Sequence, residues 1–265
     1  MTTVTHREST GSGRPIVFVH GNSSSSQTWL PLLDGDFGRT YRCVAVDLPG
    51  HGRSPAATDP DVYSMPGYAA AVAELAGELG LRQAVYVGWS LGGHILFEAA
   101  SSLPDPAGIA VFGTPPVADA AGLTAAFLPN PAVAIGFTPD VDAEQARAYA
   151  ASFLARGSAL PLDAFESDIL ATDPAARGGL GASIAAGRFA DEVAIASTLT
   201  VPLAVLHGSE EQLVSLDYLR GLNLPTLWRG EVQVIDGAGH APHVEQPEAF
   251  AALLTAFVDD CPGTS

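Results

Sequence analysis

Short runs of apolar residues recur along the chain and end at glycine or another turn-forming residue. They occupy residues 15–21, 41–47, 83–90, 108–113, 202–208 and 231–237. Because these runs are nearly continuous rather than alternating, they predict strands covered on both faces, as in a mostly parallel sheet. The alternating stretch "VTHRES" at residues 4–9 predicts an antiparallel edge strand that turns at the following "GSG".

Helical patterns separate the apolar runs. The stretch "YSMPGYAAAVAELAGELG" predicts a helix that Ser64 caps, with Pro66 in its first turn and Gly80 closing it. Two further helices are predicted from Ser90 to about residue 102 and over residues 246–260. Strands that alternate with helices through short loops predict an α/β fold, with a mostly parallel sheet flanked by helices. We expect the 265 residues to form a single domain.

The region from Thr114 to about Thr200 breaks this rhythm. It contains no strand-like run, and the stretches "VDAEQARAYAASFLARG" and "LDAFESDILATD" look helical. A departure of this length predicts a helical cap, residues 114–200, inserted above the edge of the sheet. Loops at the carboxyl edge of such a sheet usually shape the binding site, although a cap without a role in the site is the alternative.

The net charge of the chain limits the classes of binding partner to expect. The chain has 12 Lys and Arg against 29 Asp and Glu, which gives a formal net charge of −17. Without a basic cluster, nucleic acid and anionic membranes are not expected partners, and small neutral substrates are favoured. The start of the chain has no secretion signal, and no apolar run is long enough to span a bilayer. Cys43 and Cys261 are too few for a disulfide framework, so we expect a cytoplasmic protein, as a monomer or small homo-oligomer.

The segment "VGWSLGGH" places Ser90 between Gly88 and Gly92. The pattern Gly-x-Ser-x-Gly is weak by itself, but here a buried strand precedes it and an apolar helix follows it. This strand–turn–helix arrangement is a nucleophile elbow, in which the tight turn needs small neighbours. The start of the helix also places free N–H groups near the serine oxygen. We therefore predict that Ser90 is a catalytic nucleophile.

A serine nucleophile needs a base and an acid that orients it. His240, in "DGAGHAPHVEQPE", follows the last strand and is the expected base, with His243 as its competitor. The acid is expected after the penultimate strand, in "LHGSEEQLV", where the spacing favours Glu211 and leaves Glu210 as the alternative.

Asp236 and three further histidines are expected to be structural. We expect His20 to brace the loop after the first long strand, His51 to shape a loop and His94 to pack within its helix.

Acyl transfer also requires an oxyanion hole. The N–H of Leu91 is one expected donor, and the backbone N–H or side-chain amide of Asn22, in "HGNSSSSQTW", is the other. The sequence contains neither an H-x-H-x-D-H metal cluster nor a phosphate-binding loop followed by Lys-Ser/Thr. No metal and no cofactor are expected.

The motifs "HGN", "DLPGHGRS", "GWSLGG" and "GAGHAP" together resemble the α/β-hydrolase superfamily over essentially the whole chain. Several longer segments, among them "HGNSSSSQTW", "GWSLGGHI" and "GTPPVA", are similar to the α/β-hydrolase-type N-acyl-homoserine lactonases. The resemblance implies metal-independent opening of the lactone ring of quorum-sensing signals, with a glutamate acid that aligns with Glu211.

The same resemblance implies substrate contacts. The lactone-binding tyrosine of the cap aligns with Tyr149, the family asparagine matches Asn22, and we also expect Trp89 to contact substrate. Packing on the apolar face of the cap is the alternative for Tyr149. The cap matches poorly outside Tyr149, so the acyl-chain preference stays open. A carboxylesterase acting on linear esters and a non-catalytic ligand receptor are the alternative functions.

Overall fold

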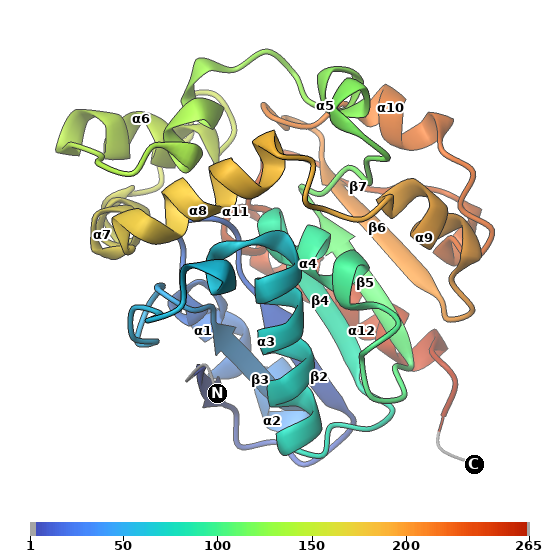
Figure 1. Ribbon diagram of the computed structural model, residues 1–265. Coiled ribbons are helices and arrows are strands. Elements are labelled where there is room, and N and C mark those ends of the chain that lie inside the picture. Colours follow the sequence, from blue (N-terminus) through green and yellow to red (C-terminus); the bar gives the residue numbers. More distant parts are fainter. Residues whose placement is uncertain (1–3, 264–265) are drawn as a thin grey trace.

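One mixed sheet of seven strands forms the centre of the computed structural model, which describes residues 4–263 (Figure 1). The strand order is β1-β3-β2-β4-β5-β6-β7, and every neighbouring pair is parallel except β1 with β3. All the predicted strands are present, including the antiparallel edge strand near the start of the chain. The strands are β1 (Thr5–Glu8), β2 (Pro15–Val19), β3 (Arg42–Asp47), β4 (Val85–Trp89), β5 (Gly108–Phe112), β6 (Leu203–Gly208) and β7 (Gln233–Ile235).

The burial of the strands explains their apolar composition. Every residue of β4, β5 and β6 is buried, because helices cover both faces of the sheet. The edge strands differ, since β1 is only partly buried and β7 is short, with a single buried residue. The continuous apolar runs therefore correspond to the inner strands, and the alternating run corresponds to an edge.

Helices lie on both faces of the sheet. Figure 1 shows α3 (Met65–Glu78) and α4 (Leu91–Ala99) in front of the sheet and α12 (Pro247–Asp260) behind it, and α3 packs against α4. The Ser64 hydroxyl accepts a hydrogen bond from the Gly67 N–H and caps α3 as predicted, and Gly80 follows with a φ of +62°. The short elements before α3 are η1 (Ser26–Trp29), α1 (Leu30–Leu33), α2 (Asp36–Thr40) and η2 (Pro60–Tyr63), and those after β6 are α10 (Leu216–Gly221), η4 (Trp228–Gly230) and α11 (Pro242–Glu245).

Only helices and loops lie between β5 and β6 in the described chain. Residues 114–200, here called the cap segment, contain α5 (Ala120–Ala126), η3 (Pro131–Phe137), α6 (Ala143–Ser152), α7 (Asp163–Ala171), α8 (Pro174–Ala185) and α9 (Glu192–Thr198). In Figure 1, α5 to α8 lie beyond the carboxyl ends of the strands, and α9 packs against α4. This placement brings cap residues over the edge where the predicted catalytic loops end.

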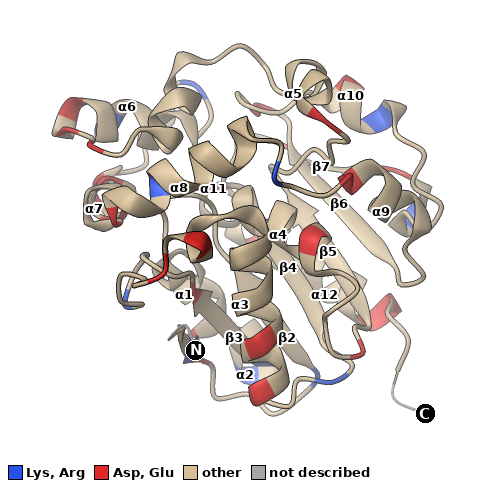
Figure 2. Cartoon of the chain, in the orientation of Figure 1, with Lys and Arg blue, Asp and Glu red and all other residues tan. Residues whose placement is uncertain are grey.

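Acidic side chains outnumber basic ones over the ribbon (Figure 2). Cys43 and Cys261 are both buried and free, in keeping with the absence of a predicted disulfide framework. Among the described helices, none combines the length and apolar character that crossing a bilayer requires.

Candidate active site

Ser90 occupies a sharp turn between β4 and α4. Its backbone has φ 52° and ψ −118°, a conformation that residues other than glycine adopt only under strain. Two hydrogen bonds hold the turn. The Ser90 N–H donates to the Phe112 carbonyl at 2.9 Å, and the Thr114 hydroxyl donates to the Ser90 carbonyl at 2.8 Å. This strained turn projects Ser90 from the carboxyl edge of the sheet, as a nucleophile elbow requires.

The glycines around Ser90 allow α4 to lie directly against the strands. A Cβ atom on Gly88 would lie 2.5 Å from the Gly93 Cα, and a Cβ atom on Gly92 would lie 2.1 Å from the Val19 carbonyl oxygen. Real Cβ atoms do not approach other atoms this closely. The small neighbours predicted from the sequence are therefore a steric requirement of this turn.

His240 and Glu211 form a buried pair. The His240 Nδ1 lies 2.8 Å from the Glu211 Oε2, and each side chain is 2 % exposed. The other carboxylate oxygen of Glu211 accepts the Leu213 N–H at 2.7 Å. Glu210, the alternative acid, is exposed, so the geometry brings Glu211 rather than Glu210 to the imidazole.

The environment keeps Glu211 ionised. Burial raises the pKa of its carboxyl group, but the attraction of His240 and the hydrogen bonds from His240 and the Leu213 N–H outweigh this effect and hold the pKa below its usual range. Because a carboxylate only accepts hydrogen bonds, the His240 Nδ1 carries the proton and Nε2 is left to act as a base.

Two contacts fix the loop that carries His240. The Glu245 carboxylate accepts the N–H groups of Gly239 at 2.6 Å and of Ala155, in the cap segment, at 2.8 Å. The Trp89 indole N–H donates to the His240 carbonyl at 2.8 Å. Sequence reasoning missed Glu245, the last residue of α11, because no motif marks it.

The expectation that Trp89 contacts substrate is not met. Its side chain is 1 % exposed, is absent from the cavity lining described below and packs against Phe153 and His243. Phe165, in α7, also packs on the ring, so no face of it is open to the cavity. Trp89 instead supports the backbone of His240.

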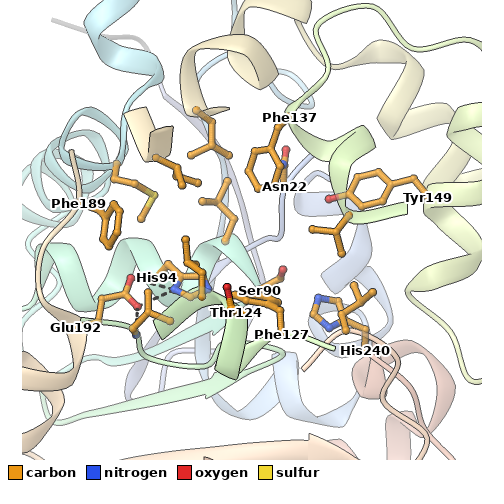
Figure 3. A pocket seen from close by; sticks show the side chains of 18 of the residues that line it. Asn22, Ser90, His94, Thr124, Phe127, Phe137, Tyr149, Phe189, Glu192 and His240 are labelled. Carbon is orange, nitrogen blue, oxygen red and sulfur yellow. Dashed lines mark hydrogen bonds and ion pairs between the residues drawn. The ribbon is translucent and has the colours of Figure 1, made fainter. Parts of the chain in front are cut away.

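A cavity of about 630 Å³ lies between the cap segment and the carboxyl edge of the sheet. Ser90, Leu91, His240 and Asn22 all line it, and Figure 3 shows Ser90 and His240 on one side with Asn22 beside Phe137. The Ser90 hydroxyl forms no direct hydrogen bond with His240 in the described structure, and catalytic contacts of this kind commonly tighten when substrate binds. Most other lining side chains are apolar and come from the cap segment, including Leu123, Phe127, Val133, Phe137, Leu180, Ile184 and Phe189.

Both expected oxyanion donors line the cavity that Ser90 faces. Leu91 is the first residue of α4, so its N–H has no partner within the helix. The Asn22 side-chain amide donates to the Gly136 carbonyl at 2.6 Å, and its oxygen accepts the Ser23 hydroxyl at 3.1 Å. Of the two possibilities for Asn22, the side chain is thus occupied by the cap segment, and the backbone N–H is the better candidate donor.

Tyr149 both packs against the cap segment and lines the cavity, which were its two expected environments. Its ring packs on Phe153 with ring centroids 4.6 Å apart, and its side chain also lines the cavity (Figure 3). Burial raises the pKa of the phenol well above its usual value, so the hydroxyl stays protonated and can donate a hydrogen bond.

His20 and His51 hold loops, whereas His243 is packed in the core. His20 accepts the Leu48 N–H at 3.0 Å and contacts the Gly21 carbonyl at 2.7 Å, which confirms its bracing role, and His51 contacts the Pro49 carbonyl within its own loop. His243 is buried against the rings of Trp29 and Trp89, and its Nε2 lies 2.6 Å from the Thr28 hydroxyl, so it is not available as the base.

His94 was expected to pack within its own helix, but it pairs with a residue of the cap segment. Its Nδ1 lies 2.9 Å from both carboxylate oxygens of Glu192, in α9, and both side chains line the cavity. Sequence reasoning missed this pair because Glu192 comes from the cap segment and carries no motif. Among residues 4–263, no group of three or more His, Cys, Asp or Glu side chains is arranged to hold a metal ion.

Comparisons with known proteins show which family the chain is similar to. Over its whole length the chain is similar to the crystal structure of the N-acyl homoserine lactonase AidH complexed with N-butanoyl homoserine, with 37% identity, a TM-score of 0.94 and coverage of 95% of that chain. It is 31% identical to a pimeloyl-[acyl-carrier protein] methyl ester esterase of Methylococcus capsulatus, over 95% of this chain and 97% of that protein. It is also 28% identical to the bifunctional biotin biosynthesis protein BioHC of Cellvibrio japonicus, of which it spans only 48%. The model of the alpha/beta hydrolase family matches residues 16–253, and the chain belongs to this family.

Proposed function

We propose that this protein hydrolyses the lactone ring of N-acyl-homoserine lactones and thereby quenches quorum-sensing signals. The observation that carries the proposal is the convergence of Ser90 with the buried His240–Glu211 pair at one largely apolar cavity. The similarity to AidH over the full chain supports the choice of substrate. AidH has been solved with N-butanoyl homoserine, and a variant of AidH has been solved with N-hexanoyl homoserine lactone.

The proposed reaction follows from the geometry of the three residues. Glu211 orients His240, whose Nε2 takes the proton from the Ser90 hydroxyl while the serine oxygen attacks the lactone carbonyl carbon. The N–H groups of Leu91 and Asn22 stabilise the oxyanion. When the ring C–O bond breaks, the protonated His240 returns the proton to the leaving alkoxide. A water molecule, deprotonated by His240, then hydrolyses the acyl-enzyme and frees Ser90.

The cyclic substrate adds a constraint to this reaction. The alcohol released by ring opening stays attached to the acyl group and can close the ring again unless water reaches the acyl-enzyme first. A route in which His240 activates water directly avoids this step. In both routes the product carries a new carboxylate, which the net charge of −17 helps to repel (Figure 2).

A carboxylesterase acting on linear esters with the same three residues is the second candidate. The 31% identity with the methyl ester esterase of Methylococcus capsulatus favours this alternative. The shared catalytic residues do not discriminate between the two functions, because a cyclic and a linear ester present the same carbonyl to Ser90.

The test compares kcat/KM for N-hexanoyl homoserine lactone with kcat/KM for p-nitrophenyl hexanoate, after subtraction of spontaneous ring opening. The lactonase proposal predicts the higher value for the lactone and background rates for Ser90→Ala on both substrates. A strong preference for the linear ester would favour the esterase. Tight retention of the lactone without turnover would favour a ligand receptor.

A further inference from the structure

A second imidazole–carboxylate pair lies in the cavity, apart from the proposed catalytic residues. Figure 3 shows His94 and Glu192 on one side of Ser90, with His240 and Tyr149 on the other. Glu192 is 1 % exposed and His94 is 14 % exposed. The wall around the pair is otherwise mainly apolar, with Phe127 and Phe189 nearby. A polar pair in this position requires an explanation that the proposed hydrolytic steps do not supply.

Glu192 fixes the orientation of His94. Its two carboxylate oxygens lie 2.9 Å from the His94 Nδ1, and one of them also accepts the Val117 N–H at 3.0 Å. Because a carboxylate only accepts hydrogen bonds, Nδ1 carries the proton. In its neutral form the ring then presents the lone pair of Nε2. No described residue bonds this nitrogen, so it is left for a ligand in the cavity.

The spacing between Ser90 and His94 matches the distance from the lactone carbonyl carbon to a substituent at C3 of the acyl chain. The two residues are four positions apart at the start of α4, which is about 6 Å along a helix axis. In an extended N-acyl-homoserine lactone, standard bond lengths place C3 of the acyl chain about 6 Å from the lactone carbonyl carbon. If Ser90 contacts that carbon and the acyl chain runs toward Phe189, C3 passes His94.

We propose that His94, positioned by Glu192, is a specificity determinant that recognises a hydroxyl group at C3 of the acyl chain. This inference rests on the proposed lactonase function and names the substrate class within it. The hydroxyl donates to the Nε2 lone pair, whereas a ketone only accepts and an unsubstituted chain offers no polar partner. A site that hydrogen-bonds a substrate hydroxyl disfavours analogues without one, because its own polar group is then left unpaired.

The experiment measures kcat/KM for the N-hexanoyl, N-(3-hydroxyhexanoyl) and N-(3-oxohexanoyl) homoserine lactones at neutral pH. The wild-type protein is expected to prefer the hydroxy substrate over the unsubstituted one. In the double variant His94→Phe/Glu192→Gln, which leaves no buried carboxylate unpaired, this preference falls by about 3- to 10-fold, the effect of one hydrogen bond. Ser197→Ala, which removes a hydroxyl from α9 outside the cavity lining, is the matched control and keeps the wild-type preference.

A single substitution gives a signature that a purely structural pair would not show. In Glu192→Gln the amide oxygen still accepts the Val117 N–H, so its NH₂ group faces His94 and the ring proton moves to Nε2. His94 then donates into the cavity, and the preference shifts from the hydroxy toward the oxo substrate.

Two results would overturn the inference. An equal loss on all three substrates in both variants would mean that the pair only holds α9 against α4. An unchanged preference would mean that the C3 substituent does not contact His94. If the wild-type protein opens none of these lactones, the proposed function itself is wrong and this inference falls with it.

Discussion

Substitution of Glu211 tests the proposed catalytic role of the Glu211–His240 hydrogen bond. The Glu211 carboxylate accepts the His240 Nδ1–H at 2.8 Å and the Leu213 N–H at 2.7 Å. In Glu211→Gln the amide oxygen can keep the Leu213 contact, but the NH₂ group then faces Nδ1. The imidazole must move its proton to Nε2, where it can no longer accept the proton of Ser90.

The expected loss has two sources. A hydrogen bond to a charged group contributes about 1.5–3 kcal/mol, which is lost when the imidazolium forms without its carboxylate. The wrong tautomer adds to this, and serine hydrolases that lose the acid in this way slow by about 10⁴-fold. We therefore expect kcat to fall by about 10³- to 10⁴-fold, or about 4–5.5 kcal/mol. Glu211→Asp keeps the charge with a shorter reach, and we expect a loss of only about tenfold.

The assay is steady-state hydrolysis of N-hexanoyl homoserine lactone by wild type, Glu211→Gln, Glu211→Asp and Glu210→Gln. Glu210→Gln is the matched control, because this neighbour is exposed and its substitution should change kcat by no more than about twofold. Circular dichroism confirms that each variant is folded. The reasoning is refuted if Glu211→Gln, correctly folded, retains more than about a tenth of the wild-type kcat, or if Glu210→Gln is the slower variant.

Three further predictions follow from single contacts. Gly113→Ala should lower kcat by at least about 10²-fold, because its Cβ would lie 2.6 Å from the His240 ring. Gly113 has a φ of +60°, so the substitution also strains the backbone; Gly187→Ala, at a φ of +66° with no atom within 4 Å, is the control for this strain, and equal kcat in the two variants would contradict the steric argument. Tyr149→Phe should raise KM for the lactone by about 3- to 10-fold while sparing kcat, because it removes only a hydrogen-bond donor from the cavity wall; an unchanged KM would assign Tyr149 to packing alone. Burial lowers the pKa of His243 from 6.5 to about 3, so between these pH values the unfolded chain binds a proton that the folded chain does not. His243 therefore makes the free energy of unfolding fall as the pH decreases below 6.5. In urea unfolding, His243→Gln should lose less stability than wild type over this pH range, and equal losses would contradict the prediction.

The fold was predictable because its signals are local. Inner strands such as β4 and β5 are buried on both faces, so their continuous apolar runs distinguish them from the amphipathic helices between them. The elbow at Ser90 was predictable for a similar reason, since the strand, the turn glycines and the helix are adjacent in the sequence. His240 and Glu211 could be placed because each follows a recognisable strand.

The parts that escaped prediction depend on side-chain direction or on the cap segment. Trp89 was expected to contact substrate, but its ring is 1 % exposed and packs among Phe153, Phe165 and His243, which its place in the sequence does not reveal. His94 and Glu192 are 98 positions apart, and no pattern in α9 indicates that its first residue reaches α4. Contacts of this kind depend on how the cap segment packs, which periodicity along one element does not determine.

The most direct test of the central claim is covalent labelling of the nucleophile. Diisopropyl fluorophosphate reacts with serines that a neighbouring base activates, and mass spectrometry of the digested protein locates the adduct. The account predicts one adduct, on the peptide that contains Ser90, and a labelling rate that drops sharply in His240→Gln. An adduct on another residue, or labelling of Ser90 at the same rate without His240, would contradict it.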